Sequence, residues 1–125
     1  MGVILVDLGQ EDRDLYANWW TWRPAIELIR SFDLIDDERL ERMGYSGVGA
    51  ELNAEQAHII GRRLKEEVLP KIQPKERVLL DLIATGEPDD GTLYDDNWFQ
   101  NYGASRDWLE EFANFCLTSQ GFRVS

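Results

Sequence analysis

The apolar positions of the chain recur mainly at the spacing of amphipathic helices. One apolar face follows a cap that we expect at Thr21 and consists of Trp22, Ala25, Ile26, Ile29 and Phe32. A second face follows a capping-box pattern that starts at Asn53 and consists of Ala57, Ile60, Leu64 and Val68. A third follows Ser105 and consists of Leu109, Phe112, Phe115 and Cys116. The spacing predicts helices over about 22–32, 54–69 and 106–118.

Capping and stop residues predict two further helices. Asp36 and Gly44 bracket a short helix over 37–43, and Pro74 opens another that ends at about Ala84. Gly61 lies on the apolar face of the 54–69 helix, where a glycine lowers helix propensity, so we expect it to permit close packing against another helix.

Few segments of the sequence have a pattern typical of β-strands, and these segments are short. The β-branched run Val3–Leu8 predicts one strand, and residues 122–124 predict a second that pairs with residues 3–7. We therefore expect an α+β fold that is mostly helical, with about five helices and a minor strand pair from the two termini. The length of 125 residues is that of one domain, spanning 1–125.

The segment 86–104 is rich in Gly, Pro, Asp and Asn and predicts a long loop, which in a compact domain is often functional. It carries aromatic residues among acids, a combination suited to binding a basic protein. The candidate partner-binding residues are Asp89, Asp90, Tyr94, Asp95, Asp96, Trp98 and Tyr102, together with Trp20 from the aromatic run before the first helix. The alternative is that these aromatic side chains fold the loop onto the body of the domain.

The net charge of −11 is unevenly distributed. Residues 1–61 and 78–125 each carry −7, whereas residues 62–77 carry +3. A field of this sign repels phosphate backbones, which argues against nucleic-acid binding, and it attracts a basic protein partner. The basic segment 62–77 is either a solvated face or a contact with acidic surface in the same chain or in a homodimer. Simple solubility is the alternative explanation for the charge.

Cysteine usage and hydropathy bear on location. The chain has one cysteine, Cys116, and no run of the roughly 20 apolar residues that a membrane-spanning helix needs. We expect a cytoplasmic protein without a membrane segment, because small secreted domains usually carry paired cysteines.

The sequence gives only weak signals for a catalytic or metal site. His58 is the only histidine, so a Ser–His or Cys–His pair would need it together with Ser46 or Cys116. The segment 44–49 resembles a nucleophile elbow, but Val48 occupies the position of its last glycine. The acids of 89–96 lack the alternating spacing of a calcium loop. We therefore assign no catalytic residue, metal or cofactor.

Two segments resemble a known family. The run Asn18-Trp-Trp-Thr-Trp22-Arg23-Pro24 with Glu27-Leu28, and the C-terminal pattern from Glu111-Phe112 through Phe115-Cys116 and Ser119 to Gly121-Phe122, are similar to signatures of a family of small bacterial proteins. The family has no activity attached to it, so the resemblance implies no catalytic residue in this chain.

These observations favour a non-enzymatic acidic domain that binds a basic protein, such as an immunity protein that blocks a toxin or an inhibitor that mimics nucleic-acid charge. The alternative is a small carboxylate-based enzyme, or a metal- or ligand-binding domain, with a pocket near Trp20 and the 86–104 loop. That alternative requires an acid with a strongly raised pKa in a concave site.

Overall fold

A computed structural model describes residues 2–45, 48–87 and 101–125. Within these ranges the chain forms four α-helices, which are α1 (Trp19–Ser31), α2 (Asp37–Met43), α3 (Ala54–Arg63) and α4 (Arg106–Thr118). The third helix continues through a π-helical stretch, Leu64–Val68, and a 3₁₀ turn, Leu69–Lys71, so the helical segment reaches Lys71.

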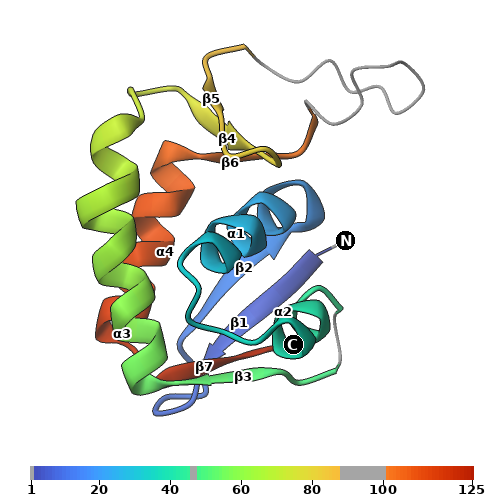
Figure 1. The fold of residues 1–125 in the computed structure, drawn as a ribbon. Helices are drawn as coiled ribbons and strands as arrows, with labels where there is room; N and C mark the ends of the chain where they lie inside the picture. Colours follow the sequence, from blue (N-terminus) through green and yellow to red (C-terminus); the bar gives the residue numbers. More distant parts are fainter. Residues whose placement is uncertain (1, 46–47, 88–100) are drawn as a thin grey trace.

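Two antiparallel sheets accompany the helices (Figure 1). The larger sheet has the strand order β2-β1-β7-β3, and the smaller has the order β5-β4-β6. The strands are β1 (Gly2–Asp7), β2 (Asp14–Asn18), β3 (Glu51–Asn53), β4 (Arg77–Leu79), β5 (Ala84–Thr85), β6 (Gly103–Ser105) and β7 (Gly121–Val124).

The fold is α+β, but the expectation of about five helices with a minor strand pair is wrong. Residues 74–84, predicted as a helix, form a turn and the hairpin of β4 and β5. Lys75 and Leu82 have φ angles of 72° and 69°, which a helix does not contain. The segments 14–18 and 51–53, for which the sequence predicted no strand, are strands β2 and β3.

Several local predictions are confirmed. The helix over 37–43 begins after Asp36 and ends at Gly44 as expected, and the last helix begins after Ser105 and covers 106–118. Asn53 and Gln56 form the full capping box of α3. The predicted pairing of the termini is present, with Leu5 opposite Val124 and Asp7 opposite Phe122.

The core lies between the helices and one face of the larger sheet. Trp22 from α1, Phe112 from α4 and Phe122 from β7 are all buried and contact one another through edge-to-face rings, with Trp22 and Phe122 both against Phe112. The other face of the sheet carries Ile4 and Tyr16, which are 43% and 56% exposed. The sheet is therefore covered by helices on one side.

Gly61 packs α3 against α4, as the sequence predicts. A Cβ atom at this position would lie 2.8 Å from the carbonyl oxygen of Ala113 and 2.8 Å from Cγ of Leu117. Gly61→Ala is therefore expected to lower the free energy of unfolding by about 1–3 kcal/mol, although alanine favours a helix by about 1 kcal/mol. Urea unfolding measures this change. The neighbouring exposed change Arg62→Ala is the control, and an equal or higher stability of Gly61→Ala would contradict the tight packing.

None of the helices that the structure describes is long and apolar enough to cross a membrane.

Candidate functional site

A groove of about 710 Å³ lies between α1, α2 and the residue before β6. We call it the aromatic groove because four aromatic side chains line it. These are Trp19, Trp20, Tyr45 and Tyr102. Its charged lining residues are Arg23, Glu27, Arg30 and Glu41, and Ile26, Leu40 and Gly44 complete it.

One strip of α1 builds the first wall of the groove. The side chain of Asn18 accepts a hydrogen bond from the backbone N–H of Thr21 at 2.9 Å, so the helix begins at Trp19 and Asn18, rather than Thr21, is its cap. This start places four residues on one strip of the helix at spacings of three and four, namely Trp20, Arg23, Glu27 and Arg30. The opposite strip, which includes Trp22 and Ile29, is buried in the core.

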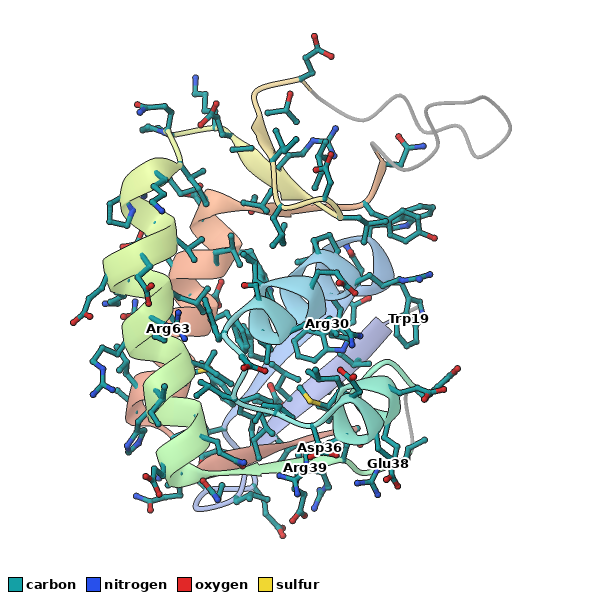
Figure 2. The ribbon with its side chains drawn as sticks, in the orientation of Figure 1. Trp19, Arg30, Asp36, Glu38, Arg39 and Arg63 are labelled. Atoms are coloured by element: carbon teal, nitrogen blue, oxygen red, sulfur yellow. The ribbon has the colours of Figure 1, made fainter. Side chains whose placement is uncertain are left out.

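A hydrogen bond and an ion pair hold α2 against α1 to form the second wall. The indole nitrogen of Trp22 donates to the carbonyl oxygen of Met43 at 2.8 Å, and both atoms are buried. At the other end of α2, the guanidinium of Arg30 lies 3.0 Å from the carboxylate of Asp37. Figure 2 shows Arg30 and Trp19 on the side of α1 that faces α2.

Tyr102 closes the groove from a distant part of the sequence. Its ring centroid lies 4.6 Å from that of Trp20, with the planes tilted by 46°. The guanidinium carbon of Arg23 lies 5.3 Å from the same tyrosine ring centroid, within the range of a cation–π contact. The structure thus brings together the two predicted partner-binding residues that it describes, Trp20 and Tyr102.

The other predicted partner-binding residues lie outside the described residues. They are Asp89, Asp90, Tyr94, Asp95, Asp96 and Trp98. Sequence reasoning did not select Trp19 or Tyr45 for this site. Trp19 could have been found from the sequence, because it is next to Trp20 in the same helix turn. Tyr45 could not, because it follows the C-terminal end of α2 and belongs to no periodic pattern of apolar residues.

The charges of the groove are partly paired. Arg30 contacts both Glu27, at 3.4 Å, and Asp37. Arg23 stacks on Tyr102, and among the described residues none forms an ion pair or hydrogen bond with the carboxylate of Glu41. The groove therefore offers exposed aromatic surface, one unpaired carboxylate and one stacked guanidinium.

The nucleophile candidates lie away from this groove. Cys116 is buried, as the sequence predicts, and burial raises the pKa of its thiol far above the usual value, so the thiolate that attacks a substrate is disfavoured. The Nε2 atom of His58 lies 2.9 Å from the carbonyl oxygen of Ser119 at the end of α4. Ser46 lies outside the described residues.

The basic segment is partly paired within the chain. Arg63 forms an ion pair with Glu67, and it also donates to the carbonyl oxygen of Phe32 at 3.0 Å. Arg77 donates to the carbonyl oxygen of Glu87 at 2.9 Å. Within the ranges that the structure describes, no three His, Cys, Asp or Glu side chains converge to hold a metal ion.

No known protein family, curated protein or solved structure matches the chain. The resemblance of the two terminal segments to a family of small bacterial proteins therefore stays a prediction.

Proposed function

We propose that the chain is a non-enzymatic protein-binding domain that holds a basic protein partner at the aromatic groove, as an immunity or inhibitor protein does. The observation that carries the proposal is the pairing of Trp20 with Tyr102 in a groove that also contains Tyr45, which is 59% exposed. Trp and Tyr dominate the binding energy of protein interfaces when a partner covers them, because they bury a large area with few rotatable bonds.

Charge supports a basic partner. The chain carries −11 overall, and at the groove Arg30 is balanced by Glu27 and Asp37. Arg23 stacks on Tyr102 and leaves the carboxylate of Glu41 without an ion-pair partner among the described residues. Opposite charge on the partner would speed the encounter and orient it. The same net charge disfavours nucleic acid. We also propose a cytoplasmic location, because the chain has a single, buried cysteine and so no intramolecular disulfide, whereas small secreted domains usually carry paired cysteines.

The first test is affinity capture from host lysate at low and high salt, with the captured protein identified by mass spectrometry and its affinity then measured with purified components. Tyr45→Ala is expected to weaken binding by about 30-fold, the loss typical of an interface hot spot of about 2 kcal/mol. Tyr16→Ala is a matched control, because Tyr16 is also a tyrosine, is 56% exposed and lies on the far sheet face. It should leave binding unchanged.

Charge is tested in the same way. Glu41→Lys is expected to weaken binding and to reduce its dependence on salt, whereas Glu111→Lys, the same charge change on exposed α4 surface, should have a much smaller effect. A partner that binds Tyr45→Ala and Glu41→Lys as tightly as the native chain would overturn the proposal. If the native chain instead binds a small molecule from the dialysable fraction of the lysate, the ligand-binding alternative replaces it.

A further inference from the structure

The outer edge of β3 has unsatisfied backbone groups. The N–H of Val124 donates to the carbonyl oxygen of Ala50 at 2.8 Å, and Leu52 lies opposite Phe122 in the ladder. Because hydrogen-bonded and non-bonded pairs alternate in an antiparallel ladder, Glu51 forms a non-bonded pair with Arg123. The N–H and C=O of Glu51 therefore point away from the sheet, and none of the described residues bonds to them.

The opposite edge of the same sheet is covered at one backbone group. In the ladder of β1 and β2, the N–H of Asp7 donates to the carbonyl oxygen of Arg13, so these two residues form a hydrogen-bonded pair. Bonded and non-bonded pairs alternate from there, which makes Tyr16 and Ile4 a non-bonded pair and turns the backbone groups of Tyr16 outward. The outward carbonyl oxygen of Tyr16 accepts a hydrogen bond from the indole nitrogen of Trp108 at 3.1 Å. Native sheets commonly cover or charge their edges to prevent unwanted pairing. On the β3 edge the outward N–H of Asn53 is bonded in the same way, to the side-chain oxygen of Gln56 at 3.0 Å, so the groups left open there are the N–H and C=O of Glu51.

A basic hollow adjoins the open edge. It has a volume of about 400 Å³ and is lined by the chain from Gly49 to Asn53 and by Arg39 and Arg42 from α2. Arg39 lies 3.7 Å from Asp36 and 3.4 Å from the side-chain oxygen of Gln56, and Figure 2 shows Arg39 next to Asp36 at the start of α2.

Two of the nearby arginines lack acceptors. Within the described ranges, no carboxylate or carbonyl oxygen pairs with the guanidinium of Arg42 or of Arg123. Arg123 stands beside the hollow, since its Cδ would lie 3.9 Å from a Cβ atom on Gly49. Arg42 and Arg123 thus bring two guanidinium groups without an ion-pair partner in the described ranges close to the open backbone groups of Glu51, although the chain carries a net charge of −11.

We propose that the edge of β3 binds an extended acidic segment of a partner polypeptide as an added strand of the sheet. The backbone of Glu51 would supply hydrogen bonds, as in other complexes formed by strand addition. Side chains of the added strand would alternate between the two faces. Those on the side of α2 would meet Arg39 and Arg42 and should be acidic, whereas the residue opposite Glu51 should be uncharged. This site is separate from the aromatic groove.

The test uses the full chain and a short peptide that alternates threonine and glutamate. Amide hydrogen exchange followed by NMR gives the direct readout. In the free protein the N–H of Glu51 should exchange rapidly and that of Leu52, which lies in the ladder, slowly. Saturating peptide should slow exchange at Glu51 by about tenfold or more while Leu52 stays protected. A peptide with lysine in place of glutamate should neither bind nor protect Glu51.

Two variants separate the contribution of the Glu51 backbone N–H to peptide binding from that of the arginine charge in the hollow. Glu51→Pro removes the outward N–H without removing a ladder hydrogen bond, and Arg42→Glu reverses one charge in the hollow; each should weaken peptide binding about tenfold or more. Arg62→Glu, the same charge change on exposed α3 surface, is the control and should weaken it far less. Equal binding of the lysine peptide, absent protection at Glu51, or unchanged affinity of Arg42→Glu would each overturn the proposal.

Discussion

Trp22→Ala is expected to lower the free energy of unfolding by about 3–5 kcal/mol, a large part of the stability of a domain of this size. The side chain is fully buried and its ring packs edge-to-face on Trp108 and Phe112, with centroids 6.5 Å and 5.9 Å away. Alanine would leave a cavity that these rigid rings fill poorly. Urea unfolding followed by far-UV circular dichroism measures the loss.

Trp22→Phe separates the hydrogen bond from the packing. Phenylalanine keeps most of the apolar volume but leaves the buried carbonyl oxygen of Met43 without its donor, so we expect a loss of about 1–3 kcal/mol. Trp20→Phe on the exposed strip of the same helix is the control and should change stability by less than about 0.5 kcal/mol. If Trp22→Phe is as stable as the native chain, the bond to Met43 does not stabilise the fold.

The same variant links stability to the proposed site. Met43 ends α2, and α2 supplies Glu41 and Leu40 to one wall of the aromatic groove. Loss of the hydrogen bond should loosen α2 relative to α1 and weaken partner binding, although Trp22 does not line the groove. Trp22 is therefore a positioning residue for the proposed interface.

Local sequence signals predicted the elements whose ends are marked by caps. Asp36 and Ser105 each accept a hydrogen bond from the backbone N–H three residues later, and their helices begin where the sequence indicates. Asn18 and Thr21 are both suitable capping residues, and the choice of Thr21 was wrong. With Asn18 as the cap, the charged strip that follows Trp20 on α1 becomes visible in the sequence.

The hairpin of β4 and β5 shows where local reasoning fails. Val78, Leu79, Leu82 and Ile83 recur at spacings that suit a helix as well as a hairpin. The structure turns at Leu82, whose φ of 69° is unusual for a bulky side chain, and the N–H of Ile83 donates to Asp81 at 3.0 Å. The identity of a leucine gives no signal of a positive φ, so tertiary packing decides the outcome.

The candidate sites depend on contacts between distant segments. Trp20 was selected for its aromatic neighbourhood and Tyr102 for its acidic loop, but no periodicity predicts that their rings meet. The open edge of β3 likewise follows from its register with β7, which a single sequence does not reveal. Composition and charge predicted the class of partner, and the fold supplies the surfaces on which that prediction can be tested.

Asp7→Asn is expected to lower the free energy of unfolding by about 2–4 kcal/mol, because it disrupts a buried, fully hydrogen-bonded carboxylate. One oxygen of Asp7 accepts hydrogen bonds from the backbone N–H groups of Gly9 and Gln120, at 2.8 Å and 3.1 Å. The other lies 2.9 Å from the guanidinium of Arg13. Asparagine would turn an N–H₂ donor toward one of these donors. The carboxylate joins the end of β1 to the turn between α4 and β7.

The pH dependence gives the sharper test. Burial alone would raise the pKa of Asp7, but the hydrogen bonds from Gly9, Gln120 and Arg13 outweigh it, so the pKa lies below its ordinary value of 3.8. A carboxyl whose pKa is lowered by folding contributes stability that is present above the unfolded-state value and is lost as the pH falls through the folded-state value. The stability difference between the native chain and Asp7→Asn should therefore be constant above about pH 5 and shrink below about pH 4.

Asp12→Asn is the matched control, because Asp12 is an exposed acid in the same turn region. Its stability should follow that of the native chain at every pH, since the side chain of Asp12 is exposed and has no hydrogen bond or ion pair among the described residues to lose. Unfolding by urea at a series of pH values compares all three proteins. A native-to-Asp7→Asn difference that stays constant down to pH 2 would show that Asp7 does not exchange a proton on unfolding. The hydrogen bonds that it accepts would then contribute to stability without favouring its ionised form.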